Sequence, residues 1–227
     1  MRSDNFYVRA NFWPSENDQP VKAAGIGPFF YNRPHDHNFN FLTVGYYGPG
    51  YWSNYYEYDH DAVAGYPGED VPSLIFVEKR ALHEGHVMFY RASVDVHDQL
   101  PADSMSISLN ILENTPRVRL TDQYSFDLER ARIKQIINIS LAPCVFDVTA
   151  SLGGENGRDV LDEIIRHSPD PFMRFCAYKA VAGSFADPDS YAKEMSRALS
   201  DDSRLVSTWA GDHLDHVRAT GAENEVA

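Results

Sequence analysis

The sequence predicts a mainly β fold over residues 1–120, followed by an all-α helical region over residues 121–227. Two observations lead to this division. Up to about residue 119 the chain is rich in aromatic residues, Gly, Pro and Asn, and short apolar runs alternate with turn signals, which is typical of an antiparallel β-sandwich or small barrel. From about residue 127 aromatic residues become sparse and the apolar residues recur at helical spacing.

The clearest strand pattern of the β region runs from Ser104 to Leu112, where polar and apolar residues alternate as in a strand with one buried face. The Gly-Pro-Gly sequence at 48–50 predicts a turn between two neighbouring strands. The same signals predict strands near residues 5–12, 22–30, 39–47, 51–58, 73–80, 86–92 and 104–112.

The second region is expected to form helix pairs. Leu128, Ile133 and Ile136 lie at helical spacing, and the Ser-Pro-Asp-Pro sequence at 168–171 and the Asp-Pro-Asp sequence at 187–189 are typical helix starts. The phrases at 168–177 and 200–206 faintly resemble HEAT-type repeats, in which an Asp-containing turn precedes an Arg. A solenoid needs three or more such units, and the sequence offers two.

Composition limits the classes of partner. The formal net charge is −13 with a pI near 5.0, and no Lys/Arg cluster interrupts the acidic surface, so nucleic acid is an unfavourable partner. Two cysteines, Cys144 and Cys176, in apolar segments are expected to be buried thiols of a reducing compartment. No apolar run is long enough to cross a bilayer, and the expected location is the cytoplasm.

Three histidines carry the functional prediction. His35 and His37 are two residues apart in an extended stretch, so their imidazoles project from the same face. His97 comes at the end of another strand-like run and supplies a third imidazole. Three neutral imidazoles around one cation, with the remaining positions open, form a site that non-haem iron and other divalent metals use. We therefore predict His35, His37 and His97 as metal ligands.

Over residues 30–112 these motifs resemble the cupin superfamily, whose members are double-stranded β-helix barrels. The His-x-His pair matches the first cupin motif. The turn Leu82-His83-Glu84-Gly85, the strand Val87-Met88-Phe89-Tyr90 and finally His97 match the second motif. The resemblance implies a metal-binding barrel as the fold of residues 1–120.

The chain departs from the usual cupin pattern in one respect. A Glu is expected four or five residues beyond the second histidine, where this sequence has Phe41 and Leu42. The site therefore looks like that of the three-histidine cupins, to which thiol dioxygenases belong. Glu57 or Asn40 could complete the coordination. The His-x-Asp pattern of 2-oxoglutarate oxygenases is absent unless Asp36 points toward the histidines.

Other side chains are expected to surround the metal. Tyr90, Arg91 and Gln99 are the predicted catalytic residues: a hydroxyl, a carboxylate-binding cation and an orienting amide. A structural ion pair is the alternative for Arg91. Further tyrosines could line the barrel, and three histidines are expected at the surface or in turns; these are Tyr46, Tyr47, Tyr56 and Tyr58, and His60, His83 and His86.

The expected function is that of a metal-dependent cupin enzyme, a non-haem Fe(II) dioxygenase or other oxygenase acting on a small molecule or modified peptide. Mn, Ni, Cu or Zn could replace iron in the same site. Two alternatives stay open: a non-catalytic ligand-sensing cupin whose helical region docks a partner protein, and an oxygen-independent isomerase or lyase. A homodimer is compatible with all three of these functions.

Overall fold

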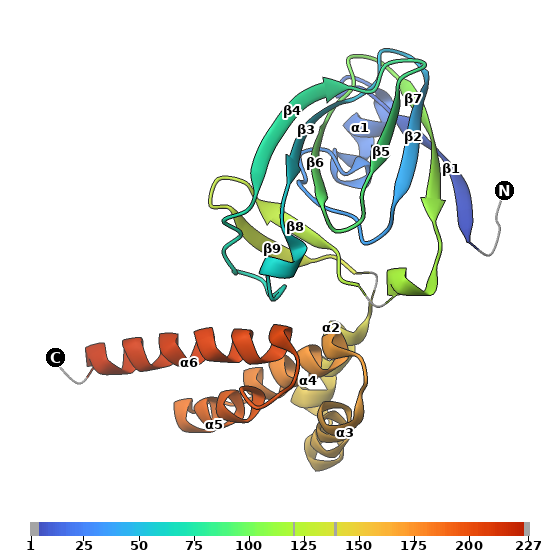
Figure 1. Cartoon of the computed structure of the whole chain (residues 1–227). Coiled ribbons are helices and arrows are strands. Elements are labelled where there is room, and N and C mark those ends of the chain that lie inside the picture. Colours follow the sequence, from blue (N-terminus) through green and yellow to red (C-terminus); the bar gives the residue numbers. More distant parts are fainter. Residues whose placement is uncertain (1–4, 120, 139, 225–227) are drawn as a thin grey trace. The chain divides into compact units, whose positions relative to one another are not determined.

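The computed structural model describes residues 5–119, 121–138 and 140–224. The chain divides into two compact units, Met1–Asn138 and Ile139–Ala227 (Figure 1). The β-rich first unit and the helical second unit agree with the predicted order of fold classes. The boundary follows Asn138 rather than residue 120, because the intervening stretch forms strands of the first unit.

The first unit contains two antiparallel sheets that face each other across its interior (Figure 1). The four-stranded sheet has the order β1-β7-β2-β5, and the three-stranded sheet has the order β4-β3-β6. In the part of the chain that the structure describes, these ladders are separate and do not close into one hydrogen-bonded ring. Their strands are β1 (Phe6–Trp13), β2 (Phe41–Tyr47), β3 (Trp52–Glu57), β4 (Ile75–Ala81), β5 (Val87–Tyr90), β6 (Asp95–Leu100) and β7 (Ser106–Glu113).

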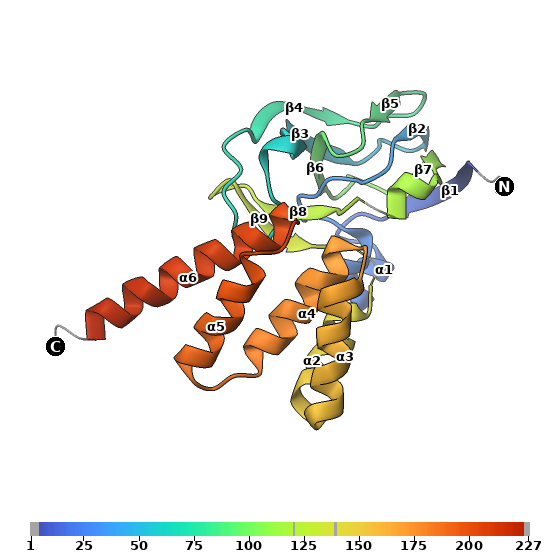
Figure 2. The same cartoon turned by 60° about the horizontal axis from the view of Figure 1, so that its bottom comes forward.

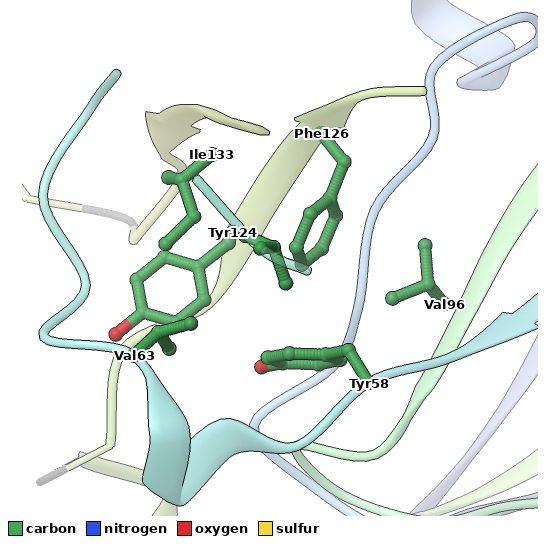
Figure 3. Packing of buried hydrophobic residues seen from close by; sticks show 7 residues of the cluster. Tyr58, Val63, Val96, Tyr124, Phe126 and Ile133 are labelled. Carbon is green, nitrogen blue, oxygen red and sulfur yellow. The ribbon is translucent and has the colours of Figure 1, made fainter. Parts of the chain in front are cut away.

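A hairpin of β8 (Tyr124–Asp127) and β9 (Arg132–Ile136) completes the first unit. The helix expected from Leu128, Ile133 and Ile136 is therefore wrong. Ala131 turns the chain with φ of 50°, and a register shift between Ser125 and Phe126 disturbs the simple alternation that identifies a strand. Ile133 instead packs into a buried cluster (Figure 3) that contains Tyr58, Val63, Val71, Val96, Tyr124, Phe126 and Ile133.

The strand expected at 22–30 is also wrong. Helix α1 (Gln19–Ala24) begins with Pro20 in its first turn, and Gly25 ends it with φ of 72°. A single turn of 3-10 helix, Gly27–Phe29, follows, and Phe30 at φ of 59° directs the chain toward the histidines. Two further 3-10 turns are His60–Ala62 and Pro116–Arg119.

The second unit packs its helices around α4 (Figure 2). Asp170 and Asp187 cap α4 and α5 by accepting hydrogen bonds from Phe172 N and Ser190 N, which confirms both predicted helix starts. Cys176 is buried in α4 as expected, whereas Cys144 on α2 is exposed. The resemblance to HEAT repeats stays a prediction. The helices are α2 (Ala142–Leu152), α3 (Gly154–His167), α4 (Pro171–Gly183), α5 (Pro188–Ala198) and α6 (Arg204–Asn224).

Among the described residues, no helix combines the length and apolar character that a membrane span requires.

Candidate metal centre

The first two histidines lie on an extended segment that bridges two strands of the first unit. His35 exchanges backbone hydrogen bonds with His97 of β6, at 3.0 Å and 2.9 Å. On its other side the same segment meets β8, since Phe126 N donates to Pro34 O at 3.0 Å and Asp36 N donates to Tyr124 O at 3.1 Å. Both edges of the segment are therefore fixed, which sets the direction of the side chains it carries.

The three predicted ligand residues come together in the interior of this unit. The Nε2 atom of His97 lies 3.1 Å from Nε2 of His37 and 3.2 Å from Nε2 of His35. The exposed fractions of His35, His37 and His97 are 3%, 9% and 3%. Among the described residues they form a group able to hold a metal ion, with candidate ligand atoms all within 4.8 Å of one another.

The spacing and the protonation state of these nitrogens fit a divalent metal. Two imidazole nitrogens that each lie about 2.1 Å from one ion are about 3.0 to 3.4 Å apart, depending on the bond angle. Burial lowers the pKa of His35 to about 4 and holds the pKa of His37 and His97 well below 6.5. All three are therefore neutral near pH 7, with lone pairs available for a metal.

Hydrogen bonding fixes the tautomer of His35. Its Nδ1–H donates to the carbonyl oxygen of Arg33 at 2.7 Å, so Nε2 carries the lone pair that faces the other two rings. Nδ1 of His97 is buried without a hydrogen-bond partner. Nε2 is therefore the nitrogen of His97 that meets other polar groups, namely the two Nε2 atoms of His35 and His37.

Asp36, between the first two histidines in sequence, points away from them. Its carboxylate accepts hydrogen bonds from Tyr58 Oη at 2.7 Å and from the backbone N of Tyr124 at 2.6 Å. Burial raises the pKa of Asp36 to about 7, although both of these hydrogen bonds act in the opposite direction. Asp36 therefore ties the histidine segment to β8 and to Tyr58, the residue after β3, and does not supply a ligand, which excludes the His-x-Asp arrangement.

The two residues considered as additional ligands make other contacts. Glu57 is at the surface, paired with Arg91. The side-chain amide of Asn40 donates to Glu113 at 2.8 Å, while its oxygen accepts from the backbone N of Ala92 at 2.9 Å. The cluster of ligand groups thus consists of three neutral imidazoles, in agreement with the expectation of a site without the usual Glu.

Two of the three predicted catalytic residues lie beside the cluster. The ring of Tyr90 is 4.9 Å from that of His97 and is stacked at 4.3 Å on Phe41. Its hydroxyl donates to Tyr55 Oη at 2.9 Å, and burial raises its pKa well above 10. Gln99, two residues beyond His97 on β6, is 3% exposed and hydrogen-bonds with Tyr51.

Arg91 does not join this group. Its guanidinium is half-exposed and forms ion pairs with Glu57 and Asp95. Arg91 is therefore a structural ion-pair residue, the alternative to carboxylate binding. The pairs hold the turn after β5, since the Asp95 carboxylate also accepts from the backbone N of Arg91. We therefore give Arg91 no place at the site.

The tyrosines near the site differ from those expected. Tyr46 and Tyr47 are 60% and 57% exposed, and Tyr58 binds Asp36 instead. Tyr51 and Tyr55, which the sequence did not single out, are buried at 2% and 7%. Tyr51, Ser53 and Tyr55 alternate as buried residues, so the inward face was readable from the period of the strand; the register shift between Tyr55 and Tyr56 in the β3–β4 ladder comes after them.

The comparisons with known proteins add little to this geometry. No family model matches the sequence, and a search of curated proteins found no match. The DMSP lyase DddQ from Ruegeria pomeroyi is 13% identical with a TM-score of 0.29, over 49% of this chain and 39% of that chain. A cupin domain from Bordetella pertussis is 11% identical with a TM-score of 0.29, over 51% of this chain and 88% of that chain. TM-scores this low carry no conclusion about the fold.

Proposed function

We propose that the first unit is a cupin-type metal centre and that the chain is a non-haem Fe(II) oxygenase acting on a small molecule or a modified peptide. The observation that carries the proposal is the convergence of three buried, neutral Nε2 atoms with no carboxylate among them. Such a set suits a first-row divalent metal better than Mg²⁺ or Ca²⁺, which prefer oxygen ligands.

His35, His37 and His97 would hold the ion through Nε2. A bound metal would offer its remaining positions to the reactants and act on them as a Lewis or redox centre. The protein supplies the rest of the site. Buried aromatic rings, Phe41 and Tyr90 among them, surround the histidines and limit access of water, which strengthens the electrostatic interactions within the site.

Tyr90 would act as a positioning group rather than a base. Because burial raises its pKa well above 10, the phenol keeps its proton throughout the physiological range. Its hydroxyl proton is directed to Tyr55 Oη, and Tyr55 in turn donates to Met88 Sδ at 3.2 Å. Gln99 would fix the neighbouring Tyr51 hydroxyl and so keep this group of phenols in one arrangement.

The test is elemental analysis of the full chain after anaerobic reconstitution with Fe(II). We expect about one equivalent of iron in the wild type, because three imidazoles and open positions suffice for one ion. His97→Ala should lose most of it. His83→Ala is the matched control, since His83 is an exposed histidine of the same unit, and it should bind as the wild type does. A wild type that takes up no first-row metal would contradict the proposal.

Oxygen consumption during turnover then decides the reaction class. An oxygenase consumes O₂ in step with the loss of substrate. If the metal-loaded protein converts a substrate without O₂, the proposed metal centre stands, and the reaction is that of a lyase or isomerase rather than an oxygenase.

A further inference from the structure

Strand β1 presents a row of polar and aromatic side chains to the interior of the first unit. Side chains two residues apart share one face of a strand, so Tyr7, Arg9, Asn11 and Trp13 point in one direction. Their partners in the β1–β7 ladder are Leu112, Asn110, Ser108 and Ser106. All four of those β7 residues are buried. The face of β1 that carries Arg9 and Asn11 is therefore the face directed inward.

Contacts on either side of Arg9 place this face against the histidine segment. At one end the ring of Trp13 lies 6.0 Å from that of Tyr31, whose hydroxyl donates to Pro14 O at 2.9 Å. At the other end Tyr7 packs on the cluster of Phe41, Tyr55, Tyr90 and Leu112, which borders the histidines. Arg9 lies between Tyr7 and Trp13 on this face, and so between these two contacts.

The side chains of Arg9 and Asn11 carry hydrogen-bond donors on this face. Among the described residues, no carboxylate forms an ion pair with the exposed Arg9, in contrast to Arg91, which is paired twice. The side-chain amide nitrogen of Asn11 is buried without a hydrogen-bond partner. A buried unpaired donor costs free energy unless a ligand satisfies it. Two neighbouring inward-facing positions of β1 thus offer hydrogen-bond donors, and one of them carries a positive charge.

We propose that Arg9 and Asn11 bind the carboxylate of the substrate whose other end reaches the three-histidine site. This inference rests on the proposed function and deepens it, since it names the substrate class as a small carboxylic acid. A guanidinium donates in a fork that matches a carboxylate. In a chain of net charge −13, an anion is repelled at long range, so its binding requires such a local cation.

The experiment uses the full chain loaded with Co(II), whose visible absorption reports ligand binding. Two probes are compared, imidazole-4-acetate and its neutral counterpart imidazole-4-acetamide; both offer a ring nitrogen to the metal, and only the first carries a carboxylate. They are titrated into the wild type, Arg9→Gln, Arg9→Lys and Asn11→Ala. Arg91→Gln is the matched control, because it removes a surface arginine of the same unit.

We expect Arg9→Gln to weaken binding of the acetate probe by about tenfold and to leave the amide probe unchanged, since a hydrogen bond to a charged group is lost. Arg9→Lys should recover part of the difference, and Asn11→Ala should lose a smaller part. Arg91→Gln should resemble the wild type. An acetate-to-amide ratio that is the same in the wild type and Arg9→Gln would overturn the proposal.

A metal-independent measurement separates this proposal from the metal centre itself. The fluorine NMR line of trifluoroacetate is recorded with metal-free wild type, Arg9→Gln and Arg91→Gln, with trifluoroethanol as the neutral probe. Broadening of the trifluoroacetate line that is lost in Arg9→Gln alone supports the anion site even if no metal binds. Equal broadening in all three proteins rejects the anion site, whatever the metal analysis gives.

Discussion

Asp36 orients the segment that carries two of the metal ligands, but it is not itself a ligand. The alternation of side chains along an extended segment turns His35 and His37 inward and Asp36 to the opposite side, where Tyr58 and the backbone of Tyr124 satisfy its carboxylate. Sequence alone predicted that the two histidines share a face. It could not decide the role of Asp36, because the partners lie 22 and 88 residues away in the chain.

Substitution of Asp36 by Asn should destabilise the protein and spare the metal site. An amide can accept only one of the two hydrogen bonds through its oxygen, so we expect a loss of about 1 to 3 kcal/mol in the free energy of unfolding. Asp103→Asn, at an exposed position, should have little effect. Urea titration measures the loss, and metal analysis should give the wild-type content. An Asp36→Asn protein that is stable but metal-free would instead make Asp36 a ligand.

The same substitution has an expected pH dependence. The pKa of Asp36 is raised from 3.8 to about 7 in the folded protein, so the folded form binds this proton more tightly than the unfolded form. The resulting stabilisation is complete below about pH 4 and is lost as the pH rises through about 7. Asn has no such proton. The destabilisation by Asp36→Asn should therefore be larger at about pH 5.5 than at about pH 8, as urea titrations at the two values would reveal.

At the scale of elements, the sequence predicted most strands of the two sheets, including β2 and β3, which contain register shifts. The strand expected at 104–112 is β7, and the helices expected after Asp170 and Asp187 begin where their caps lie. Strand β6 was not among the expected strands although its ladder with β3 is regular; Ser93, with φ of 58°, turns the chain just before it. The other two missed elements have a bulge or a positive φ. The β8–β9 hairpin combines both, and α1 replaces an expected strand between Pro20 and Gly25. In each case tertiary packing overrides a weak local pattern.

In the helical unit, Arg174 of α4 fixes the turn between α5 and α6. Its guanidinium donates to Asp201 at 2.8 Å and to Ser168 O at 2.9 Å. The side chains of Arg174 and Asp201 are 11% and 6% exposed, whereas Asp202, the other partner, is 91% exposed. The pair with Asp201 is therefore the one that matters for stability, because exposed pairs contribute little.

Arg174→Met should cost about 2 to 4 kcal/mol of stability, since it leaves a buried carboxylate unpaired. Arg166→Met, which removes a pair between exposed side chains, should cost less than about 1 kcal/mol. Denaturation followed by circular dichroism at 222 nm compares the two. Equal losses in both variants would contradict the role given to the buried pair.

Acidification should reduce the difference in stability between the wild type and Arg174→Met. Burial alone would raise the pKa of Asp201, but the hydrogen bonds from Arg174 and from Ser203 N, together with the charge of Arg174, lower it below 3.8. Its contribution is therefore present above about pH 4 and is lost as the pH falls through the lowered pKa. The stability gap between wild type and Arg174→Met should shrink on acidification below about pH 4.

At the scale of the whole molecule, all groups assigned to the site belong to the first unit, which ends at Asn138. The sequence predicts the end of this unit at residue 120, because the aromatic, Gly- and Pro-rich composition with strand-like runs continues only to about residue 119. The structure shows why the later boundary matters: the histidine segment bonds to β8 through Phe126 N and through the carbonyl of Tyr124. Without the hairpin, Asp36 and Pro34 would lose their partners, and the buried cluster in Figure 3 would lose Tyr124, Phe126 and Ile133.

Two truncated chains test this boundary. A chain of residues 1–138 should fold and bind metal with the stoichiometry of the full chain, because its ligands, its phenols and its hairpin are all present. A chain of residues 1–120 should fail to hold the metal, since one edge of the 34–37 segment is left unpaired. Metal analysis and thermal unfolding of both chains provide the measurement. If the shorter chain binds metal as well as the longer one, β6 alone positions the histidines; if neither binds while the full chain does, the helical unit is needed to stabilise the centre.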